Sequence, residues 1–232
     1  MRRLFLLVVL FFATLVSASV IGNVESVKGM VKVKAENSFK KSKVLAGYEV
    51  KDGDLITTSR KGSLVIKLVD GSTVVVDVSS TIHFVNNNTI EQNGGKVFYK
   101  ITSRSAKNSL KIKTKFAIIG IKGTTFIVDG DKDGSVLLKE GLIGVKSIKE
   151  EFELYRKKVQ DDFRNYTSKA KSEFEKFKNA QNIYAVAEAV KMFDLKSGNK
   201  ISFNGNRVNE DSWNEKDDAE FEHFEELMSS MK

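Results

Sequence analysis

The sequence predicts a mainly β protein, sandwich- or solenoid-like, with a C-terminal helical appendage. Between residues 20 and 147, apolar and polar residues alternate with a period of two, the spacing that turns one face of a strand toward a core. Turn-forming residues interrupt this alternation at short intervals. From Lys149 onward, apolar residues recur every three or four positions, which is typical of an amphipathic helix.

Residues 1–18 have the order of a secretory signal peptide. Arg2 and Arg3 precede an apolar run over residues 4–16, and small residues follow at 17–19. The run is shorter than the about 20 apolar residues that a membrane-spanning helix needs. We therefore expect cleavage before Ser19 and a protein exported to the periplasm or cell envelope. The alternative is an uncleaved N-terminal segment, which would then provide the membrane contact.

Short strands are expected throughout residues 19–148. Val31 and Val33 alternate with Lys32 and Lys34, and similar alternation follows at residues 64–68 and 74–78. Strands this short, with turns this frequent, indicate an antiparallel or solenoid-like all-β domain. The turn signals lie at residues 51–54, 70–72, 86–88, 93–95, 129–134 and 140–141.

A helical region is expected over residues 149–196. Its apolar stripe runs at three- and four-residue steps, and charged residues fill the remaining faces. This stripe packs against the β domain or forms a projecting helix that docks a partner or self-associates; the periodicity fits both interpretations. The stripe comprises Phe152, Tyr155, Val159, Phe163, Tyr166, Ala170, Phe174 and Phe177, followed by Ile183, Val186, Val190 and Phe193.

Residues 197–232 predict a short hairpin and a terminal acidic helix. Asn204-Gly205 is a favoured two-residue hairpin turn between two short apolar runs. The last helix is expected to start at Ser212, with Glu215 completing a capping box. Trp213, Phe221, Phe224 and Met228 would share one side of this helix.

Charge is distributed unevenly along the chain. Residues 19–149 carry 22 basic and 12 acidic side chains, whereas residues 150–232 carry 14 basic and 18 acidic ones. The two regions can attract each other, or the basic region can face an anionic partner. Expected export argues against nucleic acid and favours a protein or a cell-envelope polymer. Because the basic residues are spread along strands, an ordinary solvated face also explains them.

Several segments in this order resemble the FecR domain family. The most specific segments are residues 112–128 and 140–145, and the weaker ones are 22–25, 29–31, 53–58, 64–72 and 95–98. The resemblance implies an exported all-β module without a catalytic site. Regulators of this family carry a cytoplasmic anti-sigma segment before a membrane helix, whereas here only residues 1–3 precede the apolar run. Signalling to a sigma factor is therefore not expected, and regulatory sensing of a transport signal rests on family analogy.

One loop has the spacing of a calcium site. Asp129, Asp131, Asp133 and Glu140 match positions 1, 3, 5 and 12 of a calcium-binding loop, with Gly134 at the turn. The flanking residues are strand-like rather than helical, so an ordinary polar hairpin loop explains the same residues. A calcium-dependent envelope-binding protein is therefore the alternative function, and no other cofactor is expected.

The sequence offers no catalytic motif. The chain has no cysteine and two histidines, His83 and His223, which are far apart in the sequence. Thiolate chemistry is excluded, and the usual signatures of zinc hydrolases, serine hydrolases and P-loop enzymes are absent from the sequence. We expect a non-catalytic binding or scaffold protein of the periplasm or cell envelope.

Overall fold

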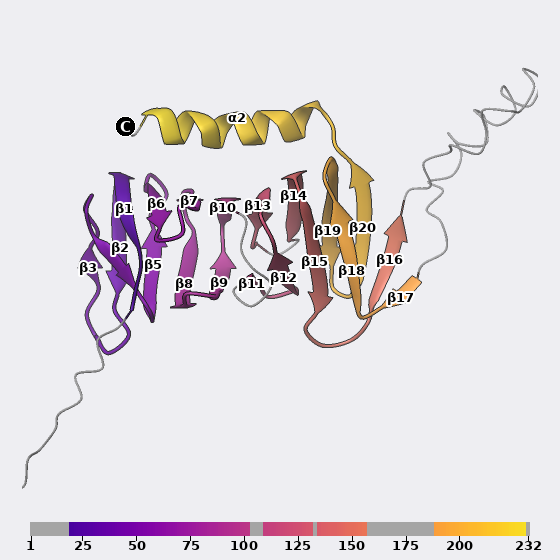
Figure 1. The fold of residues 1–232 in the computed structure, drawn as a ribbon, viewed down its shortest axis with the longest axis horizontal. Helices are drawn as coiled ribbons and strands as arrows, with labels where there is room; N and C mark the ends of the chain where they lie inside the picture. The colour runs from indigo at the N-terminus through magenta and orange to yellow at the C-terminus, as the bar shows by residue number, and fades with distance from the viewer. Residues whose placement is uncertain (1–18, 103–108, 132–133, 157–187, 231–232) are drawn as a thin grey trace, which may run out of the picture.

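A computed structural model gives the fold and describes residues 19–102, 109–131, 134–156 and 188–230. Two β-sheets stack face to face, and within the described residues one helix, α2 (Glu215–Ser230), lies across the outside of one of them (Figure 1). The predicted mainly β class with a C-terminal helix is confirmed. Residues 1–18, which hold the expected signal peptide, lie outside the described part of the chain.

The larger sheet, here called sheet A, has 11 strands. Helix α2 lies on its outer face. In spatial order its strands are β17 (Glu188–Val190), β16 (Phe152–Arg156), β20 (Arg207–Ser212), β19 (Asn199–Asn204), β14 (Ser135–Glu140), β13 (Thr125–Asp129), β10 (Lys96–Lys100), β7 (Thr73–Val76), β6 (Ser63–Leu68), β1 (Val20–Lys28) and β4 (Glu49–Lys51).

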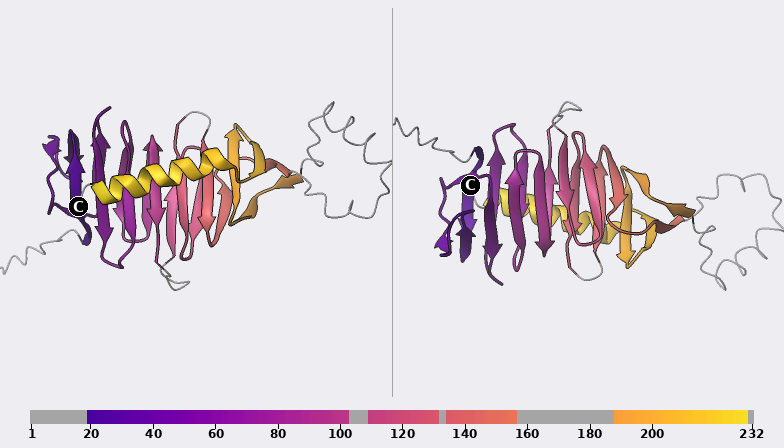
Figure 2. Two further views of the ribbon diagram at one scale, coloured as in Figure 1. Left: turned by 90° about the horizontal axis from the view of Figure 1, so that it is seen from above. Right: turned by 90° about the horizontal axis from the view of Figure 1, so that it is seen from below.

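The second sheet, sheet B, has 9 strands. Its outer face is turned away from α2, as the two views of Figure 2 show. In spatial order its strands are β18 (Met192–Lys196), β15 (Leu142–Ser147), β12 (Ala117–Ile121), β11 (Leu110–Lys113), β9 (Thr89–Gly94), β8 (Thr81–Asn86), β5 (Asp54–Thr58), β2 (Val31–Lys34) and β3 (Ser42–Lys43).

The chain builds both sheets together, because successive strands and hairpins enter them alternately. β6 and β7 pair in sheet A, β8 and β9 in sheet B, β10 returns to sheet A, and β11 and β12 return to sheet B. Gly95 makes the crossing from β9 to β10 with a φ of 75°. A Cβ at this position would lie 2.1 Å from Ser80 Oγ, so glycine suits both the dihedral angle and the space.

The main core fills the space between the sheets. Its side chains come from alternate positions of the strands, such as Ile56, Phe84 and Ile119, each fully buried. In several strands of sheet B this burial alternates with partly exposed positions, as the sequence pattern predicted. The alternation sets which side chains of sheet B face outward.

Several strands of sheet A are instead buried on both faces. Four consecutive residues are buried in β7, and four of the six in β6 are buried without a break. One outward residue from each of five neighbouring strands forms a row of direct cross-strand neighbours, here called the apolar row. The apolar row consists of Val65, Val75, Phe98, Ile127 and Leu137.

Helix α2 covers the apolar row and forms a second core with it. Phe221, Phe224 and Leu227 are buried against the row, and Trp213 and Met228 pack at its margins. Seen from above in Figure 2, the helix crosses the strands of sheet A. The last helix therefore packs on the β body of the same chain, which is one of the two arrangements expected for the C-terminal apolar stripes.

The helical region expected over residues 149–196 is wrong at both of its described ends. Residues Phe152–Arg156 form strand β16, and Glu188–Val190 and Met192–Lys196 form β17 and β18. The reason is tertiary pairing: β16 runs parallel to β20, more than 50 positions away in the sequence, and β18 pairs with β15. The middle of the expected helix, residues 157–187, lies outside the described residues.

Both sheets continue past residue 148, so the position expected to end the β domain is not the end of either sheet. β14 pairs with β19, and β15 pairs with β18. The hairpin expected at Asn204-Gly205 is present as β19 and β20, and it belongs to sheet A. Strands beyond residue 148 therefore extend the stacked sheets instead of forming a separate appendage.

Helix α2 begins later than Ser212. The Asn214 side chain accepts a hydrogen bond from the Lys216 N–H at 3.0 Å, and Asp217 accepts one from the Asn214 N–H at 2.8 Å. Asn214 and Asp217 thus form the capping pair in place of Ser212 and Glu215. Ser212 is instead the last residue of β20, because it pairs with Asn199 of β19.

Among the described residues, no helix has the length and apolar content needed to cross a membrane.

Candidate binding surface

The outer faces of sheet A and sheet B differ in how many of their lysines pair with carboxylates. On sheet A, three lysines reach carboxylates of α2: Lys96 to Glu220 at 2.9 Å, Lys139 to Glu225 at 3.0 Å and Lys200 to Asp217 at 2.9 Å. The helix carries seven acidic side chains and one lysine over residues 215–230. It therefore neutralises part of the basic charge of sheet A while it covers the apolar row.

The outer face of sheet B carries many lysines, and no helix of the described residues covers it. These lysines alternate along their strands with buried core residues, so they point away from the core. Figure 2, right, shows this face from below, with α2 behind the sheets. We call this surface the lysine face; its lysines are Lys32, Lys34, Lys43, Lys111, Lys113, Lys146 and Lys196.

Within the described part of the chain, most of these lysines have no carboxylate partner. Lys113 pairs with Glu91 at 3.4 Å, whereas the other six form no ion pair with another described residue. Among the described strands of sheet B, the outward acidic residues are Glu91 on β9 and Asp194 on β18. The lysine face therefore carries an excess of positive charge that the described part of the chain does not balance.

Strand register lines up several lysines across sheet B. Lys34 neighbours Leu55 of β5, and Lys113 and Lys146 are both direct neighbours of Ile118 on β12. Because neighbouring strands lie about 4.8 Å apart, Lys113 and Lys146 have backbones roughly 10 Å apart. The row from Lys34 to Lys146 crosses seven strands and extends about 29 Å.

Glu91 is the most engaged carboxylate of this face. It accepts a hydrogen bond from His83 Nδ1 at 3.2 Å and lies 3.4 Å from Lys113 Nζ. The hydrogen bond from His83, and then the bond and charge of Lys113, hold the pKa of Glu91 below its usual value. Glu91 is therefore ionised at neutral pH and links three neighbouring strands.

This lowered pKa predicts a pH-dependent contribution to stability. The folded state binds a proton at Glu91 more weakly than the unfolded chain does, so the ionised carboxylate stabilises the fold above its ordinary pKa. The stabilisation is lost as the pH falls through the lowered value. In urea unfolding, wild type should be more stable than Glu91→Gln at neutral pH, and the difference should shrink as the pH falls below the ordinary pKa of a glutamate. A difference independent of pH would contradict this role of Glu91.

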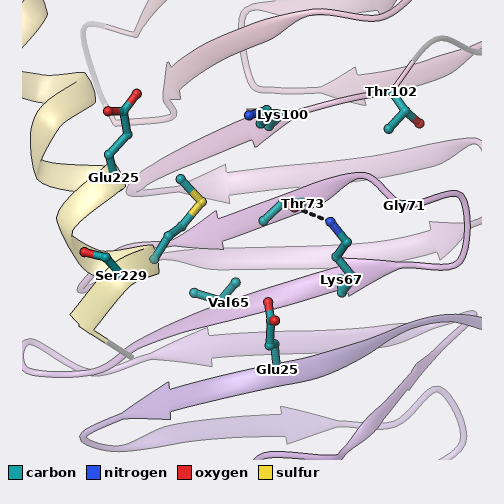
Figure 3. Close-up of a pocket in the computed structure, with 10 residues that line it drawn as sticks. Glu25, Val65, Lys67, Gly71, Thr73, Lys100, Thr102, Glu225 and Ser229 are labelled. Atoms are coloured by element: carbon teal, nitrogen blue, oxygen red, sulfur yellow. Dashed lines mark hydrogen bonds between the residues drawn. The ribbon is translucent and has the colours of Figure 1, made fainter. Parts of the chain in front are cut away.

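A groove lies beside the C-terminal end of α2 (Figure 3). It has a volume of about 430 Å³, and its walls come from sheet A and the helix. Lys67 donates a hydrogen bond to Thr73 at 3.1 Å, and Glu225 of α2 accepts one from Lys139. Lysines and glutamates line it in equal number, so the groove selects neither charge. Its lining residues are Glu25, Val65, Lys67, Gly71, Thr73, Lys100, Thr102, Glu225, Met228 and Ser229.

The structure separates Glu140 of the predicted calcium loop from Asp129 and Asp131. Asp129 accepts a hydrogen bond from the Asp131 N–H at 3.0 Å, and Asp131 accepts one from the Gly95 N–H at 2.9 Å. Glu140 instead accepts a hydrogen bond from Thr125 at 3.2 Å, at the other end of the β13–β14 hairpin. Glu140 therefore does not complete the expected site, because a strand hairpin replaces the continuous loop that the spacing assumes.

Asp133 lies outside the described residues. The described residues contain no cluster of three or more side chains suited to a metal ion. A calcium site made by Asp129, Asp131 and Asp133 stays a prediction.

The two histidines lie on different elements. His83 is on β8 of sheet B, beside Glu91, and His223 is on α2, 3.4 Å from Asp77. Another pair of polar side chains, Tyr48 and Asp54, is joined by a hydrogen bond of 2.9 Å at the edge of the β body. Burial and this hydrogen bond raise the pKa of Tyr48. Each of these contacts joins neighbouring parts of the fold, so stabilisation of the fold accounts for these polar side chains.

The stacked sheets and alternating hairpins place the chain among sandwich-type all-β proteins. Within that class, residues 54–144 match the model of the family described as FecR protein. The match runs from the start of β5 into β15, and it is to the family that the sequence resemblance implied.

Solved structures similar to the chain include two crystal structures of a candidate anti-sigma factor from Parabacteroides distasonis. They share 13% and 12% sequence identity with the chain, with TM-scores of 0.46 and 0.47. Each comparison covers 69% of this chain and 60% of the other, so the chain spans less than two thirds of those proteins. A cell surface anchoring domain shares 27% identity over 28% of this chain and 86% of its own, with a TM-score of 0.27. A search of the curated proteins found no match.

Proposed function

We propose that the protein is an exported, non-catalytic binding module that attaches to an acidic component of the cell envelope through the lysine face of sheet B. The observation that carries this proposal is the difference between the two outer faces. Sheet A is covered by α2, which also pairs with its lysines, whereas six lysines of sheet B have no ion-pair partner among the described residues.

Export and the non-catalytic role are supported by the sequence. Residues 1–18 have the order of a signal peptide, and the chain lacks the common hydrolase and nucleotide-binding motifs. Among the described residues, the titratable groups Asp54, His83 and Glu91 would be candidates for acid–base chemistry. Each of them instead takes part in a hydrogen bond that joins neighbouring parts of the fold. Attachment through a charged surface requires none of them to react.

The proposal predicts a loss of envelope binding when the lysine face is neutralised. The triple variant Lys32→Gln, Lys111→Gln, Lys146→Gln removes three exposed charges from three strands of sheet B without breaking an ion pair to another described residue. Because each lysine near an anionic surface contributes about 1 kcal/mol, co-sedimentation with isolated envelopes should weaken by on the order of 100-fold.

The matched control is Lys28→Gln, Lys67→Gln, Lys100→Gln, which removes three exposed lysines from sheet A. The two triple variants have the same net charge, so a general electrostatic effect would weaken both equally. Wild-type binding retained by the sheet A variant and lost by the sheet B variant supports the proposed function. Equal binding by both variants would refute it.

A further inference from the structure

We infer that the lysine face binds a linear polyanion, a polymer whose repeating units carry phosphate or carboxylate groups and no nucleobases. This inference rests on the proposed function and names the class of its partner. It follows from the spacing of the lysines, from the apolar residues of the face and from the kinds of side chain that the face contains.

The arrangement of the lysines suits an extended chain of negative charges. Lys34, Lys113 and Lys146 share one register row, and Lys32 and Lys111 lie two residues from members of that row on β2 and β11. Positive charges are thus about 7 Å apart along a strand, about 10 Å apart between Lys113 and Lys146, and about 19 Å apart between Lys34 and Lys113. A polymer lying across the strands would meet charges over about 29 Å, whereas a small anion would use one or two of them.

The apolar residues of sheet B argue against a second helix as the partner. On sheet A, α2 rests on five apolar residues that are direct neighbours on five consecutive strands. On sheet B, Leu55 and Ile118 are separated in their row by His83, Glu91 and Lys113. The lysine face therefore lacks a continuous stripe on which an amphipathic helix could bury its apolar side.

The kinds of side chain on the face argue against lipid and nucleic acid. Apart from the imidazole of His83, the outward residues of the described strands of sheet B include no aromatic side chain. Aromatic residues anchor proteins at lipid interfaces, and they stack on the bases of single-stranded nucleic acids. A polymer that is recognised by its charges alone needs neither an aromatic anchor nor an aromatic stacking surface.

The test uses the full-length mature protein and two defined polymers, inorganic polyphosphate and polygalacturonate, with neutral dextran as the control polymer. Titration calorimetry at low salt should show binding of the charged polymers and none of dextran. The affinity should fall steeply with added sodium chloride, since binding releases counterions from the polyanion. The sheet B triple variant should bind on the order of 100-fold more weakly than wild type, and the sheet A triple variant should bind like wild type.

The two polymers distinguish phosphate from carboxylate as the preferred group. Absence of binding to both, or equal weakening by both triple variants, would overturn the inference. Binding to phosphatidylglycerol vesicles without binding to either polymer would overturn it in favour of lipid. If polymers fail while the sheet B variant still loses envelope binding, the proposed function stands with an acidic protein as partner. If envelope binding is also unchanged in that variant, both proposals fall.

Discussion

Phe224→Ala is expected to lower the free energy of unfolding by about 3–5 kcal/mol, because it removes a fully buried ring from the second core. Phe224 stacks on Phe98 of β10 with ring centroids 5.7 Å apart, and Phe98 also meets Phe221 edge-on at 5.9 Å. Aromatic pairs add about 0.5–1.5 kcal/mol to the effect of area burial. Guanidinium unfolding followed by circular dichroism measures the change.

Phe39→Ala is the matched control for this substitution. Phe39 is fully exposed, so its loss should change stability by less than about 0.5 kcal/mol. Phe98→Ala removes the sheet A partner of the Phe98–Phe224 ring contact, so it should also weaken the attachment of α2. The chain has one tryptophan, Trp213, which stacks on Phe221 at 4.9 Å, and its fluorescence therefore reports whether α2 is attached. A loss below about 1 kcal/mol for Phe224→Ala would show that α2 does not depend on the apolar row.

Gln92→Leu is expected to destabilise the fold by about 3–5 kcal/mol, because it breaks a buried hydrogen-bond network between the sheets. The Gln92 amide donates to the carbonyls of Gly95 and Val128 at 2.8 and 2.9 Å, and its oxygen accepts from the Tyr99 hydroxyl at 3.0 Å. Gln92 and Tyr99 are both fully buried. Burial raises the pKa of Tyr99, so the hydroxyl keeps its proton and remains the donor.

A double-mutant cycle distinguishes the network from simple packing. Tyr99→Phe alone leaves the Gln92 oxygen without its donor and should cost about 1–3 kcal/mol. The double variant should be less destabilised than the sum of the single variants, since the hydroxyl left unpaired by Gln92→Leu is then absent. Asn93→Leu, at an exposed neighbouring position, is the control and should be nearly neutral. Additive losses in the cycle would contradict the proposed network.

The alternation of apolar and polar residues and the turn residues predict those strands whose pairing partners are close in the sequence. The alternation of Val31 and Val33 with Lys32 and Lys34 gives the strand β2 and its outward side correctly, since its valines are buried in the core and Lys32 is exposed. The Asn204-Gly205 turn likewise indicates a hairpin from local residues alone. These elements require no knowledge of distant partners.

Other features depend on distant partners and were missed for that reason. β16 was expected to be helical, although Phe152 and Leu154 are two residues apart and both buried, because its partner β20 is remote in the sequence. The unbroken apolar run Val74–Val76 signals burial on both faces of β7, but it does not say that α2 provides the cover.

The lysine face was missed for a similar reason. The sequence shows that single lysines point outward, and it left an ordinary solvated face as one explanation. It does not show that Lys34, Lys113 and Lys146 lie in one row, because successive hairpins alternate between the two sheets. The row becomes visible only when the order of the strands is known.

Site-specific photocrosslinking tests the central claim, that the protein binds the envelope through sheet B and not through the α2 side. The chain has no cysteine, so Lys111→Cys on β11 and Glu222→Cys on the exposed side of α2 each provide one attachment point for a benzophenone maleimide. After illumination with isolated envelopes, the label at position 111 should crosslink to envelope material, and the label at position 222 should not. Crosslinking from position 222 alone would contradict the account.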